Sequence, residues 1–346
     1  MPVPSPVPER NRNVYFVGAG LSCALGMPNT AALITDVKRE LEWESWRHSA
    51  GLDDDLTAAF DAFYPDGGAI GFTPDAVDFF SVLHSYVEVC AGFPGSLSGT
   101  ADFFRRLKFG IANLLIKRLK EADPRLEAGS NYLDEVVQPG NIVVTSNWDF
   151  GIEHYARLQG VPVRWRGRGT RTGELVVLKL HGAIDWTLGS EAQIGRFGAL
   201  EFSPLNEQAF GPGYRVSLPS GKARERCVLR MKALEEWGSA WRRVSSRTRE
   251  PYIVTMARGK TGDLGPLREI WRDAYEALSR AQRLEIVGYS LPDDDVEIRT
   301  MLRAAVRRGE GPDEIVVRNP APDVHVRFRR FLRREVQSNY LPVDAV

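Results

Sequence analysis

The pattern that most restricts the fold of this chain is a series of short, nearly continuous runs of β-branched and other apolar residues. The first run covers residues 13–17, and others follow at 141–146, 161–165, 174–180, 252–256, 284–288 and 314–318. Strands with one solvent face alternate polar and apolar residues, whereas strands of a parallel sheet covered on both faces are apolar throughout. The runs therefore predict a buried, mostly parallel sheet.

Helical patterns lie between these runs. The clearest covers residues 266–281, where one helix face carries the apolar positions Leu267, Ile270, Trp271, Ala274 and Leu278. Alternating strands and helices are typical of the α/β class, so the predicted fold is a doubly wound, mostly parallel, Rossmann-like sheet.

One long stretch, residues 31–136, interrupts this alternation, because its apolar periodicity is helical and it contains no strand-like run. We expect it to form an inserted helical subdomain, with residues 13–30 and 137–340 forming the sheet domain. Residues 1–12 are rich in proline and are expected to be a flexible lead. Residues 187–250 are expected to be loops around a helix near 231–244.

Composition excludes several classes of function. The chain has 45 basic and 45 acidic residues, so no net field favours nucleic acid or an anionic membrane, and direct nucleic-acid binding is not expected. Three widely spaced cysteines argue against a disulfide framework and against a four-cysteine zinc site. Prolines near the start and the lack of a long apolar run argue against a signal peptide and a membrane span, so a cytoplasmic protein is expected.

The turn after the first strand, "GAGLSC" at 18–23, lies between a strand and a helix, as a phosphate-binding turn does. Gly18 and Gly20 would let the backbone approach a pyrophosphate. Cys23 occupies the position of the third glycine of the dinucleotide fingerprint, so the chain does not match hydride-transferring reductases. Nor is there a P-loop, since the glycine required before Gly259-Lys260-Thr261 is replaced by Val254. The local pattern leaves nucleotide binding and a purely structural turn both open.

Polar groups follow several other strands at the edge where open α/β sheets bind ligands. The stretch "TSNWD" supplies Thr145, Ser146, Asn147 and Asp149, which suit ribose hydroxyls or the N-cap of a helix. His181 precedes a glycine and is one of only five histidines, so it is either a general base or a hydrogen-bonded structural residue.

The carboxyl-terminal third repeats the theme. Gly288 and Ser290, in "GYSLPDDD", could meet a phosphate or ribose, while Asp293 and Asp294 are expected to favour the start of the following helix through its dipole. Asn319 ends another strand and could bond a ribose or a turn.

Taken in order, "GAGLS", "TSNWD", "HG", "GYSLP" and "NP" resemble the motifs of the sirtuin family. The resemblance implies an NAD-binding Rossmann-type domain in which Gly18, Ala19, Gly20 and Ser22 hold the pyrophosphate. It implies that Thr145 and Asp149, within the turn that includes Ser146, organise the ribose pocket. Asn147 would position the ribose and water, His181 would be the general base, and Gly288, Ser290 and Asn319 would meet the adenosine half.

Departures from the zinc-containing deacylases are equally informative. There is no C-x-x-C, Asn29 stands where those enzymes carry aspartate in the segment after the first turn, and Ser146 replaces glutamine. The segments "GAGLSCALGMP" and "GYSLPDDD" instead resemble those of sirtuin-like proteins of bacterial anti-phage defence, which hydrolyse NAD.

This second resemblance implies an NAD+ hydrolase that consumes NAD as a substrate and needs no zinc. It also implies a homo-oligomer and a defence partner such as a DNA-translocating ATPase. Two alternatives stay open: an NAD-dependent protein deacylase or ADP-ribosyltransferase, and a non-catalytic sensor or assembly subunit that binds NAD or ADP-ribose.

Overall fold

The computed structural model describes residues 11–43, 52–64, 74–86, 100–165, 173–187, 229–230, 251–258, 260–307 and 311–340. Its centre is a seven-stranded sheet in which every neighbouring pair is parallel, in the order β10-β9-β8-β1-β2-β4-β3. The strands are β1 (Asn11–Val17), β2 (Ile142–Thr145), β3 (Val163–Arg164), β4 (Leu175–Lys179), β8 (Ala281–Val287), β9 (Glu314–Arg318) and β10 (Gln337–Asn339).

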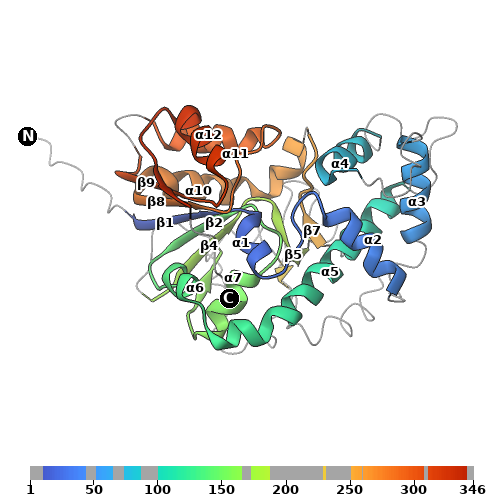
Figure 1. The fold of residues 1–346 in the computed structure, drawn as a ribbon, viewed down its shortest axis with the longest axis horizontal. Coiled ribbons are helices and arrows are strands. Elements are labelled where there is room, and N and C mark those ends of the chain that lie inside the picture. The colour runs from blue at the N-terminus through green and yellow to red at the C-terminus, as the bar shows by residue number, and fades with distance from the viewer. Residues whose placement is uncertain are drawn as a thin grey trace, which may run out of the picture.

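Helices cover both faces of this sheet (Figure 1). On one side lie α6 (Asn131–Val136) and α7 (Gly151–Leu158), and on the other lie α10 (Arg268–Arg280), α11 (Val296–Ala305) and α12 (Pro322–Leu332). Helix α10 packs on β1, β4 and β8, with Ile270, Ala274 and Leu278 buried on its predicted apolar face. The predicted doubly wound, parallel, Rossmann-like fold is confirmed.

The order of the strands places a switch point between β1 and β8. From β1 the chain proceeds to β2 and then to β3 and β4 on one side, whereas β8, β9 and β10 extend the sheet on the other side. Connections leaving a switch point diverge, so a crevice opens there at the carboxyl ends of the strands. The turns after β1 and β8 both lie at this crevice.

The run at 252–256 does not join the parallel sheet. Its strand, β7 (Pro251–Ile253), instead pairs antiparallel with β5 (Gly182–Thr187) in a three-stranded sheet completed by β6 (Leu229–Arg230). The change of sheet occurs at Gly182, whose φ of +72° lets the chain turn away after β4, and whose missing side chain leaves room for the carbonyl oxygen of Tyr252. The helix predicted near 231–244 lies outside the described residues.

The described residues between β1 and α6 form helices only. After the short α1 (Ala19–Ala24) come α2 (Leu33–Trp43), α3 (Leu52–Phe63), α4 (Ala76–Ser85) and the long α5 (Thr100–Ala128). One hydrophobic cluster continues from the sheet into these helices, and α6 packs on the sheet, where the Tyr132 hydroxyl donates to Glu285 of β8 at 3.4 Å. The exact range of a separate subdomain therefore stays a prediction.

The start of the sheet domain differs from the predicted one. Strand β1 begins at Asn11, so the last two residues of the expected flexible lead belong to the sheet, and residues 1–10 lie outside the described ranges. Within those ranges, every helix is too short or too polar to span a lipid bilayer.

The turns after β1 and β8 are joined by their backbones. The amide of Gly18 donates to Val287 O at 2.9 Å, and that of Gly20 donates to Gly288 O at 2.8 Å. A Cβ atom on Gly20 would lie 2.6 Å from the Cα of Gly288, and one on Gly18 would lie 2.7 Å from the Cα of Tyr289. The two turns can meet only because these residues are glycines.

This contact yields a stability prediction. Gly20→Ala should lower the free energy of unfolding by about 1–3 kcal/mol, because the added methyl group meets fixed backbone. Chemical denaturation would measure the change. Gly265→Ala is the matched control, since a Cβ there meets nothing within 4 Å. Equal stability of the two variants would contradict the assigned contact.

Candidate functional site

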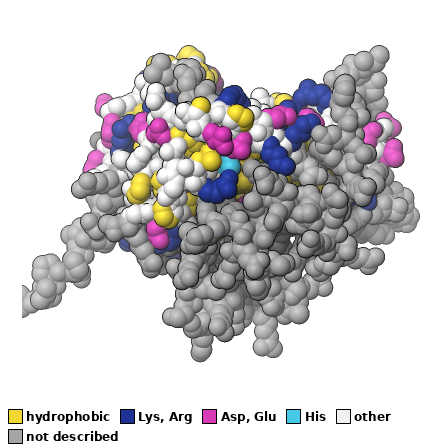
Figure 2. All heavy atoms as spheres, turned by 90° about the horizontal axis from the view of Figure 1, so that it is seen from below, with side chains coloured by type: hydrophobic (Ala, Val, Ile, Leu, Met, Phe, Trp, Pro, Cys, Tyr) yellow, Lys and Arg dark blue, Asp and Glu magenta, His cyan; other side chains and the backbone are white. Residues whose placement is uncertain are grey.

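A pocket of about 410 Å³ opens at the switch point, within the size range of small-molecule sites. Its lining comes from the turns after β1, β2 and β8, from His181 after β4, and from residues of the helical part of the chain. In the space-filling view, a histidine side chain shows between acidic and basic side chains (Figure 2). The pocket therefore gathers groups that lie far apart in the sequence.

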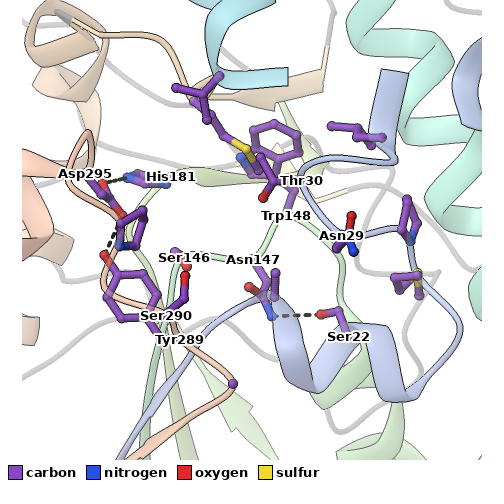
Figure 3. A pocket seen from close by; sticks show the side chains of 18 of the residues that line it. Ser22, Asn29, Thr30, Ser146, Asn147, Trp148, His181, Tyr289, Ser290 and Asp295 are labelled. Atoms are coloured by element: carbon purple, nitrogen blue, oxygen red, sulfur yellow. Dashed lines mark hydrogen bonds and ion pairs between the residues drawn. The ribbon is translucent and has the colours of Figure 1, made fainter. Parts of the chain in front are cut away.

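Asn147 is held by the turn after β1. Its side-chain Nδ2 donates to Gly18 O at 2.9 Å and to Ser22 Oγ at 2.8 Å (Figure 3). Both acceptors require an NH₂ group, which fixes the amide orientation. The carboxamide oxygen is consequently free to accept a hydrogen bond from a ligand or water in the pocket.

Ser22 links this amide to Asp149. Its hydroxyl donates to Asp149 Oδ2 at 2.6 Å, while Asp149 Oδ1 accepts from the Gly151 amide at 2.9 Å. Asp149 is only 7% exposed and contributes to the lining of the pocket. Both carboxylate oxygens are thus engaged within the protein, so Asp149 organises the turn rather than presenting a free acceptor.

A buried ion pair lies behind Asp149. Lys179, at the end of β4, donates to the Asp149 carbonyl and lies 3.3 Å from Glu153 Oε1, with both side chains only 1% exposed. Burying two charges is costly unless they are paired. The pair fixes the start of α7 beneath the site.

His181 is buried at the opposite wall. It is 4% exposed, and its ring lies 6.1 Å from that of Trp271, whose indole donates to Leu180 O at 2.8 Å. The backbone of His181 also accepts from Val254 at 2.8 Å, which ties it to the antiparallel sheet. The ring is therefore held between two sheets and α10.

Asp295 faces His181 across the turn after β8. Its Oδ1 lies 3.9 Å from His181 Nε2, and its Oδ2 accepts from the Tyr289 hydroxyl at 2.8 Å (Figure 3). Burial, followed by the charge of Asp295, raises the pKa of Tyr289 well above its usual value, so this hydroxyl remains a donor. The sequence analysis singled out neither residue, since it assigned the neighbouring aspartates, Asp293 and Asp294, only to the start of a helix.

Most of the predicted site residues line this one pocket. They are Ala19, Ser22, Asn29, Ser146, Asn147, Asp149, His181, Gly288 and Ser290. The structure brings these residues together, while their roles in binding or catalysis stay predictions.

Four predicted residues do not line it: Gly18, Gly20, Thr145 and Asn319. The amides of Gly18 and Gly20 are bonded to the turn after β8 rather than left free for a phosphate. The Thr145 hydroxyl accepts from the Asn147 amide at 3.0 Å, and Asn319 Oδ1 accepts from the Ala321 amide at 2.9 Å. These residues support the turns that shape the pocket.

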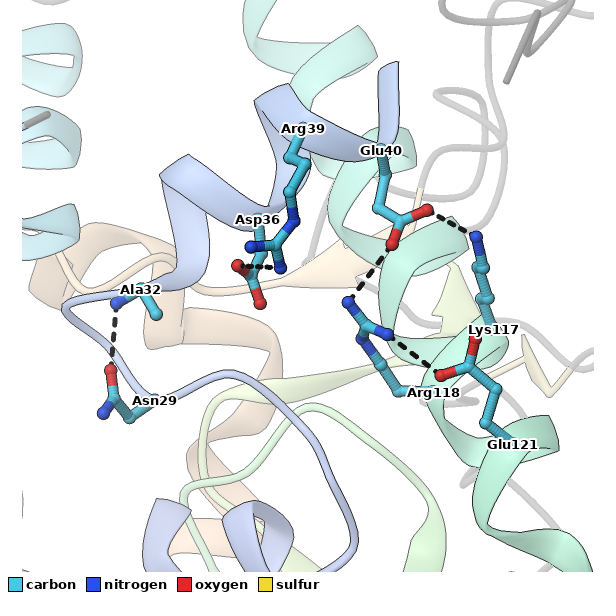
Figure 4. A network of polar contacts seen from close by, with 8 residues as sticks. All are labelled: Asn29, Ala32, Asp36, Arg39, Glu40, Lys117, Arg118 and Glu121. Atoms are coloured by element: carbon cyan, nitrogen blue, oxygen red, sulfur yellow. Dashed lines mark hydrogen bonds and ion pairs between the residues drawn. The ribbon is translucent and has the colours of Figure 1, made fainter. Parts of the chain in front are cut away.

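Asn29 lies on the segment that leads from the pocket to α2. Its Oδ1 accepts from the Ala32 amide at 2.9 Å, which turns the chain into the helix (Figure 4). Farther along, Glu40 of α2 pairs with Lys117 and Arg118 of α5 (Figure 4). Asn29 thus holds a pocket-lining segment in shape, a role that aspartate could also fill.

The helical part of the chain contributes a wall that the sequence did not predict. Asp75, Val77 and Asp78 of the α4 start and Leu115 of α5 line the pocket, as do Met256 and Arg258 after β7. Helix α4 is anchored there by Ser81, whose hydroxyl accepts from the Arg258 amide at 2.9 Å. No local pattern in the sequence marks these residues, because their contacts depend on the packing of α4 against the sheet.

The electrostatic character of the pocket is acidic. Among the residues that the structure describes, five aspartates line it, at positions 75, 78, 149, 294 and 295, against one arginine, Arg258. Asp293, expected at the helix start, instead pairs with Arg299 at 2.8 Å and is 94% exposed. An acidic lining favours a ligand that carries or develops positive charge.

Burial, and then Asp149, raises the pKa of the half-buried Cys23 thiol, which makes it a poor nucleophile. Among the described residues, no three His, Cys, Asp or Glu side chains are grouped to hold a metal ion. The prediction that zinc is not required stays a prediction.

No family model and no curated protein matches the sequence. The solved structures to which the chain is similar include a Sir2 protein with a p53 peptide and NAD+, at 16% identity and a TM-score of 0.40. Another is Sir2Tm bound to a propionylated peptide, at 14% identity and a TM-score of 0.34. Each alignment covers 97% of this chain and 90% of the other. Likeness at this level does not extend to activity.

The buried ion pair yields a prediction. Lys179→Met should lower the free energy of unfolding by about 3–5 kcal/mol, because it leaves Glu153 charged and buried. Denaturant unfolding would measure the change.

Two further variants test the cause. Lys179→Met with Glu153→Leu should recover most of the loss, since neither charge of this pair then remains. Lys117→Met is the matched control: its partner Glu40 keeps Arg118, and Lys117 is 34% exposed, so the cost should stay below about 1 kcal/mol. A large loss in the double variant would show that the pair is not the reason.

Proposed function

We propose that this chain is an NAD+ glycohydrolase, which cleaves the bond between nicotinamide and ribose to give nicotinamide and ADP-ribose. The observation that carries the proposal is the shared pocket of Asn147 and His181 at the switch point of the sheet. The motif resemblance supplies NAD as the substrate. The contacts of these two side chains support a role for each of them in the reaction.

In this reaction the bond from the ribose C1′ atom to the nicotinamide nitrogen breaks, and the electron pair leaves with the neutral base. Positive charge develops on the ribose, and a water oxygen then bonds to C1′. Preorganised dipoles and charges that face the developing charge lower the barrier. The acidic lining of the pocket, which includes Asp149 and Asp294, supplies such a field.

Asn147 would position the water. Since its NH₂ group is bound to Gly18 and Ser22, its oxygen is the atom that accepts a hydrogen bond from the pocket side. An acceptor aimed at the attacking water, or at a ribose hydroxyl, fixes the geometry of attack without any rearrangement of the side chain.

His181 would take the proton that the water loses. An imidazole has an ordinary pKa of about 6.5 and can accept a proton near neutral pH. Ala19, the first residue of α1, also lines the pocket and would border the pyrophosphate of the substrate. Gly288 and Ser290 would border the remainder of the dinucleotide.

We further propose that this activity depletes NAD during anti-phage defence, in a homo-oligomer that acts with a partner such as a DNA-translocating ATPase. This step rests on the motif resemblance alone. A cytoplasmic enzyme of this kind must be held inactive until infection. Cellular NAD should therefore fall on phage infection in cells that carry the chain, and should stay constant with Asn147→Ala.

The direct test is nicotinamide release from NAD by the purified chain without any peptide, at several protein concentrations and with and without the neighbouring gene product. Release that requires an acylated peptide would instead indicate a deacylase, and release that requires an acceptor protein would indicate an ADP-ribosyltransferase. Thermal stabilisation by NAD or ADP-ribose without any release would indicate a sensor.

Two variants test the assigned roles. His181→Ala should reduce NAD cleavage by about 10²- to 10⁴-fold, the span expected of a general base, and Asn147→Ala should be comparably damaging. Steady-state kinetics would separate the effects, because loss of binding alone raises KM and leaves kcat unchanged.

The matched controls are His84→Ala and Asn131→Ala, since neither residue lines the pocket. Their turnover should stay close to that of the unaltered chain. Near-normal turnover in His181→Ala, with the fold intact by circular dichroism, would contradict the assignment of the base.

A further inference from the structure

We propose that Asp295 is a positioning residue for His181, and that the turn from Gly288 to Asp295 is built to hold its carboxylate there. The effect on turnover rests on the proposed function. The geometry of the turn does not.

The backbone of the turn adopts unfavourable conformations. Gly288 has a φ of +59° and Leu291 a φ of +56°. Glycine tolerates this region, whereas a residue such as leucine rarely enters it. Leu291 is nevertheless fully buried. Such a conformation persists only where the surrounding structure enforces it, and it is often found at functional sites.

Two arginines from different helices enforce it. Arg299 of α11 donates to Leu291 O at 3.0 Å, and Arg327 of α12 donates to Ser290 O at 2.8 Å. Charge-assisted bonds to consecutive carbonyls fix the direction of the chain between them. The turn is therefore clamped from outside while its inner side lines the pocket.

Asp295 then stands at the N-cap of α11 but does not cap it. An aspartate at this position ordinarily accepts from the first free amides of its helix. Here the side chain makes no capping bond. Its side chain is 9% exposed and is turned toward Tyr289 and His181 instead. The helix forgoes a stabilising contact, which indicates a different use for the carboxylate.

Tyr289 fixes the far oxygen of that carboxylate. Its ring packs edge-on against Phe16 of β1, with 5.0 Å between centroids, and its hydroxyl donates to Asp295 Oδ2. The near oxygen, Oδ1, is left facing His181 Nε2 at 3.9 Å. That separation is long for a hydrogen bond, and such contacts often shorten once a substrate binds.

A carboxylate in this place has two consequences for a general base. It selects the ring orientation of His181, and it stabilises the imidazolium that forms when the ring takes a proton. The other charged groups of the same pocket are Asp75, Asp78, Asp149, Asp294 and Arg258. Of the carboxylates that line the pocket in the described ranges, Asp295 is the one paired with His181.

The test compares Asp295→Asn with Asp293→Asn. Asparagine keeps the shape and can still accept from Tyr289, but it lacks the charge. Asp293→Asn removes the same charge two residues away at an exposed side chain. Proton uptake by His181 would be followed by NMR of the histidine ring signals, assigned with His181→Gln, and nicotinamide release would be measured across the same pH range.

In Asp295→Asn, the midpoint of the His181 titration should move to lower pH by about one unit, because an opposite charge has been lost. The acid limb of the pH–rate profile should move the same way, and turnover should fall at least about tenfold. Asp293→Asn should change neither. Tyr289→Phe, which frees the carboxylate, should reduce turnover while the titration still responds to Asp295.

An unchanged His181 midpoint in a folded Asp295→Asn protein would overturn the proposal, whatever happens to turnover. If the unaltered chain releases no nicotinamide under any condition, the proposed function fails instead, and the NMR titration still decides the role of Asp295.

Discussion

The backbone crossing of the turns after β1 and β8 is the contact on which the site depends. Gly18 and Gly20 meet Gly288 and Tyr289 at distances that leave no room for a side chain. This contact joins the turns after β1 and β8 at the switch point. It also presents Ser22 on one side and the Gly288–Asp295 turn on the other, so the pocket exists because two glycine-containing turns share one space.

Several polar side chains of the site are held by hydrogen bonds within the protein. Asn147 uses its NH₂ group to hold the turn after β1, which exposes its oxygen. Ser22 bridges Asn147 to Asp149, and Lys179 supports Asp149 from behind. A buried donor without a partner is costly, so each hydrogen bond in this series restricts the orientation of the next side chain.

The sheet and the gathering of the motifs were predictable from sequence, because apolar runs and strand-end polar residues are local signals. The antiparallel pairing of β7 was not, since it depends on the turn at Gly182, which takes its partner strand β5 away from the parallel sheet. The contact of Gly18 and Gly20 with the turn after β8 was not predicted, because the sequence shows that a position tolerates close approach but not which segment approaches it. Asp295 was missed because a carboxylate before a helix has the same local pattern whether or not it caps.

The acidic lining of the pocket suits the proposed cleavage of NAD, in which positive charge develops on the ribose. Carboxylates would stabilise an oxocarbenium-like ribose, provided that they do not compete with the general base for the water. Asp149 meets this condition, because its oxygens are already bonded to Ser22 and Gly151. Asp295 is likewise tied to Tyr289, so its charge acts on His181 through space and not by taking the proton. In the proposed reaction, the charges that face the cation would thus be fixed in the protein, and the oxygen of Asn147 and the ring of His181 would act on the water.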